Sequence, residues 1–244
     1  MTTVTNSPQG LKYHVDITFV VDTTGSMSSL IDTVKKNILN FYPDLIRVAN
    51  EKGKSVSQLR IRVISFKNYE YDKQDAIISS NFFTLSNESQ MDSEEDKLKE
   101  YVDHLEATGG SLSSEQGWRE NGLEALTEAI RSEWDMGGNK RRHIIVLFTD
   151  VAPLLFEEGR NYAGSYYPSN MPKNLDELTD MWDAPQGALM PKASKRLCLF
   201  APECETWSTI SSTWNEVTHW PAKAGEGLSE TDYNQILDAI MNSI

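Results

Sequence analysis

An acid and two hydroxyls directly follow one apolar stretch near the start of the chain. Asp22, Thr24 and Ser26 come after the run Phe19-Val20-Val21, which contains no polar side chain. Such a run is typical of a strand that is buried on both faces, as in a parallel sheet. Alternate residues in a tight loop can point the same way, so one carboxylate and two hydroxyls can converge. Oxygen ligands with a single formal charge suit a hard cation such as Mg²⁺.

A purely structural interpretation of the same residues stays open at this point. Ser and Thr satisfy the free N–H groups at helix N-termini, so Thr24 and Ser26 could simply cap the helix that follows. Zinc is disfavoured as the metal because no Cys or His lies nearby. The loop therefore indicates either a site for a hard cation or a helix cap.

A second acid follows a second apolar strand pattern. Residues 143–148 are predicted to form a buried strand that ends at Thr149 and Asp150. Parallel strands share their carboxyl end, where ligands bind in open α/β sheets, so both acids are expected at one edge. Between them lies a turn rich in glycine and hydroxyls, which contains Gly109-Gly110-Ser111. These segments predict one site assembled from three loops.

The elements that must position these loops alternate between strand and helix patterns. This alternation predicts an α/β fold, Rossmann-like and doubly wound, with a mostly parallel sheet of about six strands and helices on both faces. A helix is expected over 28–51, with a kink or break near Phe41-Tyr42 because Pro43 lies within it. The strands 59–66 and 76–85 are expected to pair as a hairpin-like edge. Further helices are predicted at 118–134, 206–214 and 229–244, strands at 196–201 and 216–220, and an acidic loop with a helix start at 86–96.

A long segment separates Asp150 from the next strand. Residues 151–195 contain Tyr162, Tyr166, Tyr167 and Trp182, and a short helix is expected at 174–182. Connections of this length are usually functional or partly structured. Because the segment leaves from Asp150, its early part must pass over the expected site. Its aromatic side chains predict either a packed cover or a recognition surface.

Composition limits the classes of partner and compartment. The chain has 244 residues and a formal net charge of −13, with no stripe of Lys and Arg, so nucleic acid and anionic membranes are disfavoured partners. Residues 1–9 lack the pattern of a secretory signal, and no apolar run approaches the roughly 20 residues of a membrane span. Only Cys198 and Cys204 are present, which predicts unpaired thiols in a reduced, cytoplasmic protein.

Three motifs in this order resemble the von Willebrand factor A-type domain with its metal-ion-dependent adhesion site. They are the loop Asp22-x-Thr24-x-Ser26, the turn Gly109-Gly110-Ser111 and the strand end Phe148-Thr149-Asp150. The resemblance spans residues 12–244 and implies a single domain over 1–244 with an insertion at 151–195. The metal ligands that it implies are Asp22, Thr24, Ser26, Ser111 and Asp150.

The motifs differ from the family pattern at a few positions. Thr24 stands where Ser is commoner, Ser111 stands where Thr is usual, and Val151 follows Asp150 where Gly is typical. Ser113 or Thr108 could replace Ser111 as the ligand from the second loop.

The resemblance also implies a mode of binding. Mg²⁺ prefers six oxygens, and a site with few direct carboxylates leaves the ion under-neutralised with an open position. In the family, a Glu or Asp of a protein partner fills that position. We therefore expect Mg²⁺, with Mn²⁺ or Ca²⁺ also open, and a protein partner that supplies an acid. The chain is most similar to cytosolic bacterial-type members, some encoded near protein kinases and phosphatases, which implies a kinase- or phosphatase-linked assembly.

Other classes of function fit the residues less well. The stretch Asp22-Thr23-Thr24-Gly25 looks like the Asp-Thr-Gly of aspartic proteases, but an extra Thr interrupts it. A phosphoaspartyl hydrolase needs a second acid where Thr24 stands, and the His residues are scattered along the chain. We therefore expect a binding module and not an enzyme. The alternatives are a metal-dependent hydrolase or phosphatase and a metal-free scaffold.

Overall fold

A single mostly parallel sheet lies at the centre of the computed structural model, which describes residues 12–85, 91–110, 119–138, 140–184, 189–222 and 237. The sheet has seven strands in the order β3-β2-β1-β5-β6-β7, and β4 pairs with β2 beside β3. The strands β1, β2, β5, β6 and β7 run parallel, while β3 and β4 are antiparallel to β2. The bounds are β1 (Lys12–Asp22), β2 (Ser55–Phe66), β3 (Ile77–Ser79), β4 (Phe83–Leu85), β5 (Lys140–Phe148), β6 (Lys195–Pro202) and β7 (Val217–Ala222).

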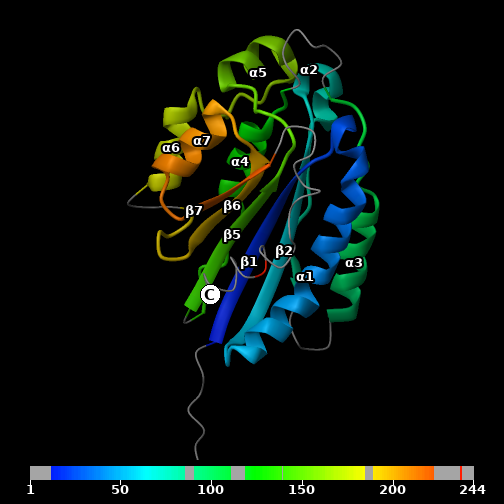
Figure 1. Ribbon diagram of the computed structural model, residues 1–244, viewed down its shortest axis with the longest axis vertical. Helices are drawn as coiled ribbons and strands as arrows, with labels where there is room; N and C mark the ends of the chain where they lie inside the picture. The colour runs from blue at the N-terminus through cyan, green and yellow to red at the C-terminus, as the bar shows by residue number, and fades with distance from the viewer. Residues whose placement is uncertain are drawn as a thin grey trace, which may run out of the picture.

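Helices cover both faces of the sheet, as the strand and helix alternation predicts. Figure 1 shows α1 (Ile31–Glu51) and α3 (Met91–Asp103) along one face. The other face carries α4 (Gly122–Ile130), α6 (Leu175–Asp183) and α7 (Glu205–Thr213). The short α2 (Tyr69–Asp72) and α5 (Phe156–Ala163) lie at the top of the view, beyond the carboxyl ends of the strands.

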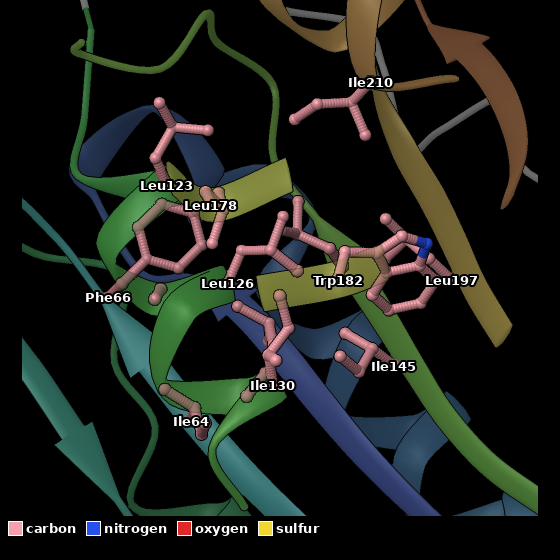
Figure 2. Close-up of a cluster of buried hydrophobic side chains, with 14 of the residues drawn as sticks. Ile64, Phe66, Leu123, Leu126, Ile130, Ile145, Leu178, Trp182, Leu197 and Ile210 are labelled. Carbon is pink, nitrogen blue, oxygen red and sulfur yellow. The ribbon is translucent and has the colours of Figure 1, made fainter. Parts of the chain in front are cut away.

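The strands send alternate side chains into two cores, one on each face. In β1, Phe19 packs toward α1, where its ring lies edge-on to Phe41 with 5.6 Å between the ring centroids. Val20 belongs to the opposite core, together with side chains of α4, α6 and α7. The labelled side chains in Figure 2 are part of that core: Ile64, Phe66, Leu123, Leu126, Ile130, Ile145, Leu178, Trp182, Leu197 and Ile210.

The start of β1 carries a buried acid within this apolar environment. Asp16 is 1% exposed and accepts two hydrogen bonds from the Arg60 guanidinium of β2, at 2.8 Å and 2.5 Å. The backbone N–H of Asp135 donates to the same carboxylate. Paired donors of this kind compensate the desolvation of a buried charge. Asp16 therefore belongs to the packing of β1 against β2.

Three sequence predictions differ from the observed elements around the first helix and the sheet edge. The helix α1 begins at Ile31 because a 3-10 helix over Gly25–Ser29 precedes it, and it continues through Pro43 without a break. Fully buried Phe41 and Leu45 on either side of Pro43 hold both halves of the helix against the sheet. The sheet has seven strands where about six were expected.

The extra strand arises because the segment 76–85 is divided. The Ser80 hydroxyl accepts the N–H of Val63 at 3.0 Å and replaces a backbone partner, so β3 ends at Ser79 and β4 starts at Phe83. The helix α4 is also shorter than the predicted span 118–134. Glu120 forms a parallel bridge with Pro153, which keeps the backbone before Gly122 extended.

The later elements agree with the sequence within a few residues. The predicted helix at 174–182 is confirmed as α6, with the Asn174 side chain capping the N–H of Glu177 at 3.0 Å. Cys198 and Cys204 are both free, as predicted. Within the described residues, no helix is long and apolar enough to cross a membrane. Most of the predicted segment 229–244 and part of the acidic run 86–96 lie outside the described residues.

Candidate metal centre

The two predicted acids lie at the carboxyl ends of neighbouring parallel strands. Val21 of β1 is aligned with Phe148 of β5, so Asp22 and Asp150 leave the sheet at the same edge. Asp22 is fully buried and Asp150 is 1% exposed. Strand pairing therefore brings together two acids that are more than a hundred residues apart in the chain, as the sequence predicts.

Asp22 is surrounded by hydroxyl and amide donors. Its Oδ1 accepts hydrogen bonds from the Thr24 backbone N–H at 2.9 Å and from Thr24 Oγ1 at 2.6 Å. Its Oδ2 accepts a hydrogen bond from Thr149 Oγ1 at 2.7 Å. Thr24 follows β1 and Thr149 follows β5, so residues after two neighbouring strands bind the two oxygens of this carboxylate.

The cluster of side-chain oxygens continues from Thr24 to the second acid. Thr24 Oγ1 and Ser26 Oγ are 3.1 Å apart, and Ser26 Oγ donates to Asp150 Oδ1 at 3.0 Å. Four of the predicted site residues therefore lie together, with neighbouring side-chain oxygens 2.6 to 3.1 Å apart. Ser26 is the solvent-exposed member of the four, so the group opens to solvent on its side.

The loop does not use these hydroxyls as helix caps. Thr24 is the N-cap residue of the 3-10 helix over Gly25–Ser29, yet its side chain makes no capping hydrogen bond. Thr23 points away from the group, because its hydroxyl donates to the carbonyl of Phe66 at 3.2 Å. The side chains of Thr23 and Thr24 therefore point in different directions, as the sequence predicts for this loop.

The electrostatics of the group favour a cation. Burial raises the pKa of Asp22 to about 6, and the charge of Asp150 adds to this rise against hydrogen bonds from Thr24 that lower it. Burial also raises the pKa of Asp150. Among the residues that the structure describes, no ion pair involves either acid. Two buried carboxylates without a basic partner are stabilised by a bound divalent ion.

The set of oxygen donors matches a hard cation such as Mg²⁺, which carboxylates, hydroxyls and water coordinate. The group contains two carboxylates and two hydroxyls. It is not a cluster of three or more His, Cys, Asp or Glu side chains, and none of that kind occurs in the described part of the chain. The residues present therefore fit a site of hydroxyl-rich type and not one of the His- or Cys-rich type typical of zinc.

The second loop approaches this group through its glycines. Ser111 and Ser113 lie outside the described residues, while exposed Thr108 accepts a hydrogen bond from Lys67 Nζ at 2.9 Å. Gly110, which directly precedes Ser111, has φ +85°, and a Cβ there would lie 2.7 Å from the Thr24 side chain. The described end of the second loop is therefore packed against the first loop.

Sequence reasoning did not assign roles to three residues near the group. Thr149 donates a hydrogen bond to Asp22. Its position directly before Asp150 is the feature of the sequence that could have indicated this role. Glu120 is 3% exposed, and a Cβ on Gly110 would lie 2.9 Å from its Oε1. Asp72 Oδ2 accepts the N–H of Gly110 at 3.0 Å. Neither Glu120 nor Asp72 belongs to a recognisable motif, so only the fold brings them to the loop.

The described residues of the insertion 151–195 are partly buried and partly exposed. Tyr167 and Trp182 are 9% and 1% exposed and belong to the core under α4, so this part is a packed cover. Tyr162 and Tyr166 are 39% and 49% exposed. Tyr162 belongs to α5, which lies beyond the carboxyl ends of the strands (Figure 1).

Comparisons with known proteins show the class of fold. No family model matches the chain, and no curated protein matches it significantly. Two crystal structures of the pilus adhesin SpaC from Lactobacillus rhamnosus GG are similar, each at 15% identity over 94% of this chain. Their TM-scores are 0.55 and, for the open conformation, 0.50, and this chain covers 31% and 30% of those chains.

A third similar structure is proximal thread matrix protein 1 from the mussel byssus, with a TM-score of 0.47 at 11% identity. The match covers 96% of this chain and 49% of the mussel protein chain. At these identities the likeness to the adhesin shows the fold alone, a mixed α/β fold around a mostly parallel sheet.

Proposed function

We propose that this protein is a divalent-cation-dependent protein-binding module of the von Willebrand factor A type. Asp22, Thr24, Ser26 and Asp150 bind Mg²⁺, with Ser111 from the second loop, and an acidic side chain of a protein partner completes the coordination. One observation carries the proposal: two buried carboxylates without a basic partner among the described residues accept hydrogen bonds from the Thr24 and Ser26 hydroxyls, whose oxygens are 3.1 Å apart.

The charge and exposure of the group support a partner that brings an acid. The hydroxyl ligands are neutral, and Mg²⁺ usually keeps several waters that an incoming oxygen can replace. Asp22 and Asp150 are buried while Ser26 is exposed, so a partner reaches the centre from the Ser26 side. Tyr162 of α5 and the nearby Tyr166 are exposed and suit a protein interface, where Tyr is enriched. The helix α5 lies beyond the carboxyl ends of the strands (Figure 1).

The compartment and the partner class follow from the sequence and stay proposals. We propose a cytoplasmic location, which the two free thiols support. The similar SpaC structures are of a pilus adhesin, and adhesion is a binding function. A kinase- or phosphatase-linked assembly is the partner class that we favour.

Calorimetric titration of Mg²⁺ tests the centre directly. We expect one site in the wild-type protein and at least about tenfold weaker binding in Asp22→Ala, Ser26→Ala and Asp150→Ala. Asp32→Ala is the matched control, because this exposed acid lies in the first turn of α1 close to the loop. Asp22→Asn, which keeps the volume of the side chain, serves if Asp22→Ala does not fold.

Two outcomes would contradict the proposal. Retained Mg²⁺ binding in all three variants would place the ion elsewhere. A partner complex that survives both EDTA and Asp22→Ala would remove the metal bridge. Turnover of a generic phosphate ester in Mg²⁺, lost in Asp22→Asn, would instead favour the hydrolase alternative.

A further inference from the structure

The short helix α2 meets the second loop of the candidate metal centre through one carboxylate. Asp72 Oδ2 accepts the backbone N–H of Gly110 at 3.0 Å and that of Asn68 at 3.3 Å. The other oxygen, Oδ1, lies where a Cβ on Gly109 would be, so only glycine admits this approach. Asp72 therefore both binds the turn and determines its residue type.

Asp72 is carried by a segment that is fixed from several sides. The Asn68 side chain donates to the carbonyl of Arg119 at 3.0 Å, and the Tyr69 N–H donates to Asn121 Oδ1 at 2.7 Å. The Tyr69 ring packs edge-on against Tyr167 of the insertion, with 5.8 Å between the centroids. These contacts tie α2 to the start of α4 and to the insertion, which gives Asp72 a rigid base.

The opposite side of the same turn is attached to the first loop. The N–H of Thr108 donates to the carbonyl of Thr23 at 2.9 Å, and the N–H of Gly25 donates to the carbonyl of Gly109 at 3.2 Å. Gly110 lies against the Thr24 side chain. The turn is thus held between the loop that carries Asp22, Thr24 and Ser26 and the carboxylate of Asp72.

We propose that Asp72 is a positioning residue for the metal centre: it fixes the Gly109-Gly110 turn against Thr24 and so holds the described end of the second loop beside the ligands of the first loop. This inference rests on the proposed function. Asp72 makes no hydrogen bond to the four described ligands, so it acts through the turn and not as a ligand. Residues that orient the ligands of a metal contribute strongly to its affinity.

The variants separate position from charge. Asp72→Ala removes the acceptor, Asp72→Asn keeps an acceptor oxygen without the charge, and Asp75→Ala removes an exposed acid three residues away. We expect Mg²⁺ affinity to fall about tenfold in Asp72→Ala and to stay within about threefold of wild type in the other two. If Asp72→Ala does not fold, Asp72→Glu replaces it, because the extra methylene moves the carboxylate off Gly110.

A second measurement needs no metal. Amide hydrogen exchange of residues 104–110 in the metal-free protein should be faster in Asp72→Ala, or in Asp72→Glu, and unchanged in Asp72→Asn and Asp75→Ala. Equal exchange in all the proteins would overturn the positioning role, whatever the metal data show.

The two proposals fail in distinguishable ways. Wild-type Mg²⁺ binding with unchanged affinity in every Asp72 variant overturns only the role of Asp72. Equal losses in Asp72→Asn and Asp72→Ala also overturn it, because charge and not position would then matter. Absence of Mg²⁺ binding in the wild-type protein overturns the proposed function, and the role of Asp72 at a metal falls with it.

Discussion

Ser26 donates a hydrogen bond to Asp150 across 124 residues of sequence, with 3.0 Å between Ser26 Oγ and Asp150 Oδ1. Ser26 belongs to the loop after β1, and Asp150 follows β5, which pairs with β1 in the sheet. This bond joins the two halves of the candidate metal centre at its solvent-exposed side. It also identifies the substitution that perturbs the centre with the smallest change of structure.

We predict that Ser26→Ala weakens Mg²⁺ binding about tenfold while the stability of the fold changes little, because Ser26 is exposed. Ser28→Ala, an exposed serine on the same 3-10 helix, is the control and should bind Mg²⁺ like wild type. Calorimetry and thermal melts of both variants provide the test. Equal affinities for the two variants would exclude Ser26 as a ligand.

Thr149→Val should destabilise the metal-free protein by about 2 kcal/mol, because a buried carboxylate loses a hydroxyl donor. The bond at stake joins Thr149 Oγ1 to Asp22 Oδ2 at 2.7 Å, and valine fills the same volume. Urea unfolding measures the free energy. Thr149→Ser keeps the hydroxyl and should recover most of the loss, and an equal loss in both variants would argue for packing instead.

Two glycines with positive φ provide a matched pair for the second loop. Gly110 has φ +85° and no room for a Cβ beside Thr24, whereas Gly53 has φ +67° with nothing within 4 Å of a Cβ. Gly53→Ala should lower the free energy of unfolding by about 1 kcal/mol through backbone strain alone. Gly110→Ala should lower the free energy of unfolding by more than Gly53→Ala does, and it should also weaken Mg²⁺ binding. Equal free energies of unfolding would mean that the turn at Gly110 relaxes freely.

The stability of the fold should depend on Glu124 between pH 4.5 and 7. Burial raises the pKa of Glu124 from 4.5 to about 7, although hydrogen bonds from Tyr167 and Asn121 and the charge of Arg160 oppose this rise. The folded state therefore binds the proton more tightly than the unfolded state, so stability falls as pH rises through this window and levels off above it. The fall amounts to at most about 3 kcal/mol.

The variant Glu124→Gln isolates that contribution. Glutamine is neutral at every pH and keeps an acceptor for the Tyr167 hydroxyl, which lies 2.7 Å from Glu124 Oε1. Chemical unfolding at several pH values should show a smaller decline in the variant than in wild type. Parallel pH profiles would contradict a raised pKa at Glu124.

The class of fold and the two acids could be predicted because each rests on a local pattern. The run before Asp22 is apolar on both faces, and so is the run before Asp150. A strand of that kind must be covered on both sides, which favours a parallel sheet with helices on each face. Parallel pairing then brings the two strand ends to one edge. The alternation of Thr23 and Thr24 follows from the same local geometry.

Element ends were less predictable because they depend on partners far along the chain. The helix α4 begins only at Gly122, since Glu120 pairs with Pro153 from the insertion. The strand predicted over 76–85 is interrupted where Ser80 bonds to Val63 of β2. Local propensity carries no information on either contact.

By itself the sequence determined at which edge of the sheet Asp22 and Asp150 lie, and it predicted the oxygen ligands that we propose for a hard cation. Only the tertiary structure decided the hydrogen bonds around them. Thr149 donates to Asp22, and Asp72 accepts the N–H of Gly110, which lies 38 residues further along the chain. The physical reason is the distance along the chain over which each property is set. Strand burial and alternation are properties of a few consecutive residues, whereas the direction of a hydrogen bond depends on which distant segments pack side by side.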